Sequence, residues 1–396
     1  MMNIVKIIFP LIVLPYMTHI LSVETYGVVA YEKAVMQYMI IFVDFGFLLS
    51  GTKDIALSKG KGEKLYFEIG NIFLARMFLC LVAFFALLAM ICVVPILRQN
   101  ILYTILAFLA VFLSCFLMEF VFRGIEHMEL ISIPFIVMKS ISTILTFVFV
   151  KSDSDILWIP VLDVLGTFVA VFIVLFFFYK LGLKLKFGSY REIYNKLKNS
   201  AVYFFSNMAT TAFTALNTLL IGMFIQASEV AYWSLCVQMI GAAQSLYTPV
   251  IDGIYPHMVK TRDLSVVKRT FKIFMPVVIS GCIFTIFVAK YALAIIGGIK
   301  YMVAAPLLRI LVLVLLFSFP SMMLGWPVLG AVGKEKQVTY TTVFTAVFQV
   351  VGLIVLIVFN LFDLMYIAVL RGISEFVLFI TRYYFVKKYE NDFVNN

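Results

Sequence analysis

Long apolar segments separated by short polar connections run along almost the whole chain. A helix needs roughly 20 apolar residues to cross the hydrocarbon core of a bilayer, which is about 30 Å thick. Segments of that length are expected at residues 3–22, 31–52, 69–94, 101–122, 130–150, 156–179, 199–225, 229–252, 271–296, 303–330, 338–359 and 362–386. The pattern predicts an all-α polytopic membrane protein with about 12 transmembrane helices.

The longest polar connection, KLGLKLKFGSYREIYNKLKNS, separates the sixth segment from the seventh. One helical face of its second half is apolar and the other is basic, with Tyr190, Ile193, Tyr194 and Leu197 opposite Arg191, Lys196 and Lys198. This spacing predicts an amphipathic helix at the membrane surface, with an ordinary solvated linker as the alternative. We therefore expect an N-terminal six-helix lobe with a cytoplasmic linker at residues 1–190, and a C-terminal six-helix lobe at residues 191–396.

Lysines and arginines gather in alternate connections. The even-numbered connections and the C-terminal tail carry 21 of them: Lys53, Lys59, Lys61, Lys64, Arg123, Lys180, Lys184, Lys186, Arg191, Lys196, Lys198, Lys260, Arg262, Lys268, Arg269, Lys272, Lys334, Lys336, Arg382, Lys387 and Lys388. The odd-numbered connections carry four, namely Arg98, Lys151, Lys290 and Lys300. By the positive-inside rule, the even connections and both termini are predicted to be cytoplasmic.

Composition supports the membrane class and limits what the positive charge can mean. The 396 residues are 63% hydrophobic and 13% charged, and we expect no cleavable signal peptide. The net charge of +10 is explained by topology and by contact with anionic lipids, so no nucleic-acid partner is expected. The five cysteines lack metal-ligand or disulfide spacing and the three histidines are isolated, so no metal site is expected.

Several charged residues lie at membrane depth, where an ionised side chain costs roughly 2.5–3.5 kcal/mol at a helix centre. The cations among them are Lys6, Lys33, Arg76, Lys139, Arg309 and Arg371. Arg371 lies four residues before Glu375, so pairing within the helix is favoured there. Arg76 and Arg309 lie close enough to a helix end to snorkel. Lys33 and Lys139 are harder to place in lipid, and a water-filled cavity suits them.

Prolines and glycines are expected to interrupt several of the predicted spans. The positions are Pro10, Pro15, Gly46, Gly51, Pro134, Pro249, Gly253, Pro256, Pro320, Gly325 and Pro327. Interrupted helices are tolerated where neighbours or cavity water satisfy the freed backbone, and in transporters they often mark bending elements and sites. The two halves also resemble each other weakly, because Asp44 and Asp252 each lie near the end of the second span of their half.

Enzymatic function is disfavoured by what the sequence lacks. Extracytoplasmic connections of about ten residues or fewer leave no room for the catalytic loop of a membrane glycosyltransferase or polymerase. The sequence contains no G-x-x-x-x-G-K-[ST], H-E-x-x-H or G-x-S-x-G motif. We expect a transporter without a cofactor, driven by an ion gradient, the membrane potential or the gradient of its own substrate.

Stretches of the sequence resemble a known family. LPYMTHIL followed by VETYGVVAYEKAVMQYMIIFVDFGF resembles the opening of bacterial polysaccharide repeat-unit flippases, the Wzx-type O-antigen transporters of the multidrug/oligosaccharidyl-lipid/polysaccharide exporter superfamily. Further matches follow in the family's order: FRGIEHME, NSAVYFFSNMATTAFTALNTLLIG, EVAYWSLCVQMI, LYTPVIDGIYPHM, and IIGGIKYMVAAPLLRIL with VLGAVGKEKQ. Two features depart from the family: His19 stands where Arg is commoner, and the N-terminus is shorter than usual.

The resemblance implies a MATE-like fold, with two six-helix lobes around a central cavity that works by alternating access. The implied substrate is an undecaprenyl-pyrophosphate-linked oligosaccharide, moved from the cytoplasmic to the periplasmic leaflet of the bacterial inner membrane. The polysaccharide polymerase and the chain-length regulator are further candidate partners. The candidate cavity residues that would bind the substrate are Lys33, Lys139, Arg76, Arg309, Arg371, Gln37 and Asn217.

A cation-coupled multidrug exporter of the same superfamily is the second hypothesis. The acids at membrane depth that would bind its proton or sodium ion are Asp44, Asp163 and Glu32. A polymerase or glycosyltransferase is the third hypothesis, which the short connections disfavour.

Overall fold

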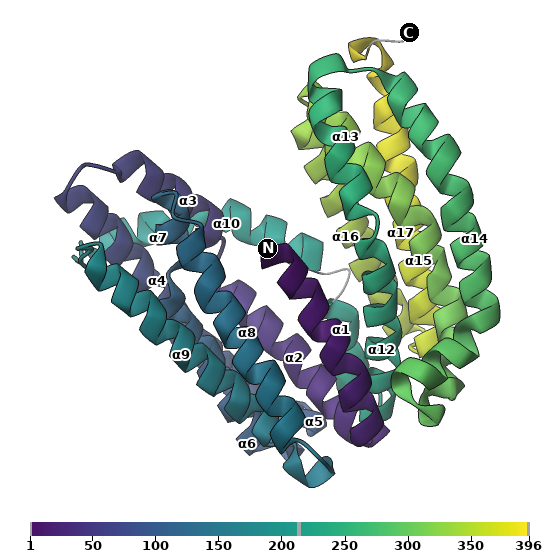
Figure 1. Cartoon of the computed structure of the whole chain (residues 1–396), viewed down its shortest axis with the longest axis horizontal. Helices are drawn as coiled ribbons and strands as arrows, with labels where there is room; N and C mark the ends of the chain where they lie inside the picture. Colours follow the sequence, from purple (N-terminus) through teal and green to yellow (C-terminus); the bar gives the residue numbers. More distant parts are fainter. Residues whose placement is uncertain (1, 212–214, 394–396) are drawn as a thin grey trace. The chain divides into compact units, whose positions relative to one another are not determined.

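The computed structural model describes residues 2–211 and 215–393, and within these ranges the chain is almost entirely helical with no β-strand (Figure 1). The first helices are α1 (Met2–Ile20), α2 (Val23–Asp44), α3 (Phe47–Ser58), α4 (Glu63–Val93), α5 (Pro95–Gln99), α6 (Ile101–Ser114), α7 (Glu119–Gly124), α8 (Glu129–Phe149), α9 (Trp158–Lys180) and α10 (Tyr190–Thr211). The later ones are α11 (Asn217–Phe224), α12 (Ala227–Ser245), α13 (Thr248–Thr261), α14 (Leu264–Gly297), α15 (Ala305–Met323), the π-helix η5 (Leu324–Leu329), α16 (Glu335–Val358) and α17 (Leu364–Lys388). The predicted all-α class is confirmed.

Nine helical stretches of the described chain are long and apolar enough to cross a membrane. They coincide with nine of the twelve predicted spans, so the multi-pass prediction is confirmed. The other three predicted spans also fall on helices: 3–22 on α1, 199–225 on α10 and α11, and 229–252 on α12 and α13. Because residues 212–214 lie outside the described part, the total of twelve stays a prediction.

The chain folds into two compact units, Met1–Met208 and Ala209–Asn396. In the first unit, a core of apolar side chains such as Ile55, Ile72 and Phe120 joins α3, α4 and α7. In the second unit, α15 is central, because it packs against α12, α14 and α17. The boundary between the two six-helix lobes, expected at residue 190, follows from the predicted membrane spans and stays a prediction.

The second and fourth predicted spans of each half are broken at matching places. In the first half, the breaks lie at Gly46 between α2 and α3 and at Met118 between α6 and α7, each with a left-handed backbone. In the second half, the breaks lie near Tyr247 between α12 and α13 and at Gly325, whose backbone is not helical, in η5. This correspondence is the clearest structural sign of a repeat.

Gly46 is required by its backbone and by its neighbour. Its φ is 79°, and an added Cβ would lie only 2.6 Å from the Cβ of Tyr203 in α10. The predicted interruption there is confirmed. Other predicted interruptions are wrong, because α1, α3, α8, α13 and α15 continue through them: Pro10, Pro15, Gly51, Pro134, Gly253, Pro256 and Pro320. A membrane helix can absorb a proline when local adjustments satisfy the freed carbonyl.

The predicted amphipathic helix is present as the N-terminal part of α10, and it packs on the first unit. Ile193 and Leu197 contact the apolar core of that unit. Lys196 forms ion pairs with Asp54 at 2.6 Å and with Glu68. Burial alone would lower the pKa of Lys196, but its hydrogen bonds to both carboxylates hold that pKa above its ordinary value. The alternative of an ordinary solvated linker is therefore wrong for this part of α10, because Lys196 binds it to α3 and α4.

Candidate functional site

The two faces of α2 carry different polar groups. The helix begins after Ser22, whose hydroxyl accepts a hydrogen bond from the backbone N–H of Thr25. Lys33 and Gln37 lie one turn apart and are both exposed. Glu32 is completely buried. Because neighbouring residues of a helix point in different directions, α2 presents a cation on one face and an acid on another.

Lys33, Lys139 and Asp163 form a charge cluster in the first unit, which they reach from α2, α8 and α9. The ammonium of Lys33 interacts electrostatically with the Asp163 carboxylate and with the Lys139 ammonium. The hydroxyl of Ser142 donates a hydrogen bond to Oδ1 of Asp163 at 2.5 Å. Two cations and one carboxylate leave a net positive charge, and all three side chains are at least partly exposed. Such a group attracts anions.

Glu32 is buried against α6 and lies outside this charge cluster. Its Oε1 accepts a hydrogen bond from the hydroxyl of Thr104. Its Oε2 has no hydrogen-bond partner among the residues that the structure describes. The buried phenols of Tyr31 and Tyr103 interact electrostatically with this carboxyl group. An ionised carboxylate in such surroundings costs free energy, which a bound proton or cation would offset.

Arg76 is buried in the first unit, so the snorkelling alternative is wrong for it. Its guanidinium donates hydrogen bonds to the carbonyls of Ser114 and Cys115 at 3.4 and 3.3 Å, where α6 gives way to irregular backbone. Asp44, which is half-buried, interacts electrostatically with Arg76 and accepts a hydrogen bond from the backbone N–H of Leu48 at 3.4 Å. Arg76 thus stabilises the broken end of a span and lies close to one candidate ion-coupling acid.

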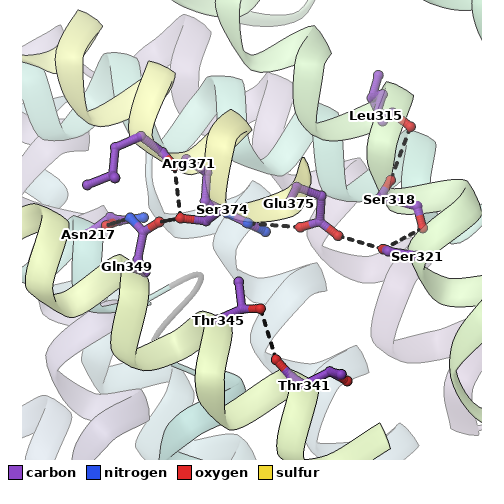
Figure 2. Close-up of polar contacts among 11 residues, drawn as sticks. Asn217, Leu315, Ser318, Ser321, Thr341, Thr345, Gln349, Arg371, Ser374 and Glu375 are labelled. Carbon is purple, nitrogen blue, oxygen red and sulfur yellow. Dashed lines mark hydrogen bonds and ion pairs between the residues drawn. The ribbon is translucent and has the colours of Figure 1, made fainter. Parts of the chain in front are cut away.

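A buried polar network joins α11, α16 and α17 in the second unit (Figure 2). Nε2 of Gln349 donates a hydrogen bond to Oδ1 of Asn217 at 3.1 Å, and the hydroxyl of Ser374 donates one to Oε1 of Gln349. All three residues are fully buried. The predicted binding residue Asn217 is therefore a member of this network, and its carbonyl oxygen is already hydrogen-bonded.

The ion pair predicted between Arg371 and Glu375 is confirmed, at 2.9 Å and with both side chains nearly buried. Oε1 of Glu375 also accepts a hydrogen bond from the hydroxyl of Ser321 in α15 at 2.9 Å (Figure 2). Both oxygens of this carboxylate are thus hydrogen-bonded. The pair extends the polar network from α17 to α15.

Arg382 is a buried cation, so its predicted place in the cytoplasmic tail is wrong. It lies within α17, and its Nη1 and Nη2 donate to the carbonyl of Ser321 at 2.7 Å and the hydroxyl of Thr342 at 3.0 Å. In the sequence, Arg382 lies close to the basic residues Lys387 and Lys388, so it resembles part of the tail. Helical spacing could have predicted its burial. Arg371, Glu375 and Arg382 are separated by four and seven residues, so they share one face of α17.

Arg309 lies apart from these groups. It is exposed on α15, and its Nε donates to the carbonyl of Ile286 in α14 at 3.0 Å. The structure therefore brings Lys33, Lys139 and Asp163 together, places Arg76 near Asp44, and leaves Arg309 alone. In the part of the chain that the structure describes, no group of three or more His, Cys, Asp or Glu could hold a metal ion.

Comparisons with known proteins agree with this architecture. A family model described as "Polysaccharide biosynthesis protein" matches residues 1–262. A candidate O-antigen transporter of Shigella dysenteriae is 28% identical over 261 residues, which are 64% of each chain. One of Escherichia coli (strain K12) is 25% identical over 263 residues, 66% of this chain and 63% of that one. The chain therefore matches slightly less than two thirds of the length of these relatives, which are named as transporters and not as enzymes.

Solved structures share the fold along nearly the whole chain. The lipid II flippase MurJ in an inward closed conformation is 13% identical, with a TM-score of 0.75 over 98% of this chain and 87% of that one. A multidrug resistance MATE family transporter in an inward-facing conformation is 14% identical, with a TM-score of 0.67 over 97% of this chain and 99% of that one. The predicted MATE-like fold is confirmed.

Proposed function

The chain belongs to the polysaccharide biosynthesis protein family, and from this membership we propose that it is a flippase for lipid-linked oligosaccharides. Its relatives are named as candidate O-antigen transporters, and its structural neighbour MurJ is named a lipid II flippase. The proposed substrate is an undecaprenyl-pyrophosphate-linked repeat unit of O-antigen or of a related surface polysaccharide. The proposed direction is from the cytoplasmic to the periplasmic leaflet of the inner membrane.

The observation that carries this proposal is the charge cluster of Lys33, Lys139 and Asp163. Cations within membrane spans are costly in lipid, and such residues usually mark a substrate or ion pathway. A pyrophosphate head is anionic, so two lysines, one on α2 and one on α8, supply the positive charge that it needs, while the lipid tail can stay in the bilayer. Gln37, one turn beyond Lys33 and also exposed, can donate a hydrogen bond to a sugar hydroxyl.

The transport cycle that we propose is alternating access between two six-helix lobes around a central cavity. In this cycle the head group binds the charge cluster from the cytoplasmic side, and the lobes then reopen toward the periplasm. Arg76, Arg309, Arg371 and Asn217 stay secondary candidates for substrate binding, because the first three already donate to protein groups and Asn217 lies in the buried network.

Glu32, Asp163 and Asp44 are the proposed ion-coupling residues. Glu32 is the best placed of the three, because Oε2 of its buried carboxyl group has no partner in the described part of the chain. A proton or a monovalent cation that binds there in one conformation and leaves in the other would link transport to an ion gradient.

Substitution of the two lysines tests the proposal. We expect Lys33→Ala or Lys139→Ala to abolish surface polysaccharide display while the protein inserts at normal levels, with lipid-linked repeat units accumulating inside the cell. Lys290→Ala, which removes an exposed lysine from α14, is the matched control and should leave display intact. Full display in both cluster variants would remove the role that we give to the cluster.

A cation-coupled multidrug exporter is the second candidate function, which the buried carboxyl group of Glu32 also suits. Drug susceptibility of a deletion strain separates the two. Loss of display with unchanged drug resistance favours the flippase, and increased drug sensitivity with a normal surface glycan favours the exporter.

The membrane placement that we propose is a multi-pass protein of the bacterial inner membrane with both termini in the cytoplasm. Reporter fusions at Lys61 and Ser152 check it, because these residues fall in an even and an odd connection. The polysaccharide polymerase and the chain-length regulator are proposed partners, and co-purification with the full chain tests both.

A further inference from the structure

A pocket of about 470 Å³ lies within the second unit, lined by residues of α13, α15, η5 and α17. Its size falls in the range of about 300–1,000 Å³ that is usual for small-molecule sites. Asp252 and Tyr255 line it from α13, Trp326 from η5 and Arg382 from α17. The transport mechanism proposed above gives no role to these four residues.

Trp326 is presented to this pocket by an irregular helix. The non-helical backbone of Gly325 precedes it in the π-helix η5. An added Cβ at Gly330 would lie 2.9 Å from the indole ring, so the absence of a side chain there lets the ring lie against the helix. The side chain stays 55% exposed, whereas Trp233 in the same unit is 1% exposed. The indole of Trp326 therefore adds a free apolar surface to a pocket that Ile251, Met322 and Pro327 also line.

Arg382 is fixed at the wall of the pocket. It is more than nine-tenths buried, and it donates to Ser321, Thr341 and Thr342 at 2.7, 3.4 and 3.0 Å. An added Cβ at Gly325 would lie 2.8 Å from its Nη1, so that glycine leaves room for the guanidinium. These contacts use three of the five N–H groups of a guanidinium. The hydrogen bonds found in the described chain leave the other two N–H groups unused.

Asp252 and Tyr255 line the pocket from α13, and both are exposed. The pocket thus contains one carboxylate, one guanidinium, one phenol and one indole. The opposite charges of Asp252 and Arg382 sum to zero, so the pocket has no net charge that would favour a strongly anionic or a cationic ligand. A neutral molecule with many hydroxyls suits both, because the carboxylate accepts and the guanidinium donates hydrogen bonds.

We infer that this pocket is a sugar-binding subsite, in which a sugar ring stacks on Trp326 and its hydroxyls bond to Asp252 and Arg382. The inference rests on the proposed function for the kind of glycan, which would be part of the repeat unit of the lipid-linked substrate. The subsite recognises the saccharide, whereas the charge cluster of the first unit takes the anionic head.

Calorimetric titration of the purified full-length chain in lipid nanodiscs tests the inference. The probe is the free oligosaccharide repeat unit, released by mild acid from lipid-linked intermediates of the host strain. We expect saturable binding, a Kd about tenfold weaker for Trp326→Ala and for Asp252→Asn, and nearly full retention in Trp326→Phe. Trp158→Ala, which removes a 41% exposed tryptophan of the first unit, is the matched control and should bind as the parent does. Thermal melts of each variant confirm folding.

The outcomes separate this inference from the proposed function. Absence of binding to the parent protein, or an unchanged Kd in both pocket variants, overturns the subsite. If a deletion strain loses surface display but Trp326→Ala restores it and binds normally, the flippase stands and the subsite is wrong. If the deletion strain displays its glycan normally, the flippase is wrong, and the titration alone decides whether the pocket binds sugar.

Discussion

Glu32 in the first unit and Glu375 in the second are both buried within membrane spans, but they differ in their hydrogen bonds. In the second unit, both oxygens of Glu375 are hydrogen-bonded, one to Ser321 and one to Arg371. In the first unit, only one oxygen of Glu32 is bonded, to Thr104, and the other has no partner in the described chain. A buried charge is tolerated when its hydrogen-bonding capacity is filled. Glu375 therefore acts as a fixed part of the architecture, while Glu32 has capacity left for a proton or an ion.

The cations follow the same division. Arg371 and Arg382 of the second unit donate to neighbouring side chains and carbonyls. Lys33 of the first unit is exposed, and it interacts electrostatically with the carboxylate of Asp163 and with the ammonium of Lys139. In the second unit, Arg371, Glu375 and Arg382 thus hold helices together. In the first unit, Arg76 and Lys196 also bind protein groups, so the contrast concerns Lys33 and Lys139, which we propose bind a ligand.

The largest effect on stability is expected from Glu375→Gln. This change leaves the buried guanidinium of Arg371 without its counter-charge, and breaking a buried pair costs about 3–5 kcal/mol. Thermal unfolding of the purified protein should show a clear loss of stability. Glu335→Gln, at an exposed position on α16, is the control and should change the melting temperature little. Equal melting temperatures for both variants would contradict a structural role for Glu375.

The next effect is expected from Gln349→Ala. The substitution removes the amide that bridges Asn217 and Ser374, and each buried group left unsatisfied costs about 1–3 kcal/mol. The same thermal assay measures the loss. Gln337→Ala, on the same helix but only half-buried, should cost less. A similar loss in both variants would show that the buried network contributes no special stability.

A smaller effect on stability but a large one on transport is expected from Glu32→Gln. The amide keeps an oxygen for the Thr104 hydroxyl and adds no charge, so we expect a change within about 1 kcal/mol. Ion-dependent transport, measured as repeat-unit translocation in vesicles with and without an imposed proton or sodium gradient, should lose its dependence on the gradient. Retention of that dependence would exclude Glu32 as the coupling group.

The smallest effect on stability is expected from Lys33→Ala, because surface substitutions usually change stability by less than about 0.5 kcal/mol. Melting temperature and membrane yield should match the parent. A large loss of stability would mean that Lys33 is structural, and the difference between the two units would disappear.

The fold was largely predictable from the sequence, and the reasons are physical. Apolar runs of membrane-spanning length and the Arg371–Glu375 spacing follow directly from helix geometry, so both predictions hold. The prolines of α1 and α8 were misleading, because a helix can absorb a proline and the sequence does not say when it does.

The candidate sites were less predictable, because they depend on which helices meet. Glu32 precedes Lys33 in the sequence, yet it bonds to Thr104 of α6. Asp163 could be assigned to Lys33 only after α2 and α9 were placed. Arg382 lies near the C-terminus in the sequence, and only the packing of α17 against α15 and α16 buries it.

The binding of an anionic lipid-linked head by the charge cluster is tested most directly by the sidedness of the repeat unit. In spheroplasts, a membrane-impermeant enzyme that cleaves the glycan measures the fraction of lipid-linked repeat unit on the periplasmic face. For the Lys33→Ala, Lys139→Ala double variant, inserted at parental levels, we predict that this fraction falls to that of the deletion strain. A fraction equal to that of the parent would contradict the role of the cluster.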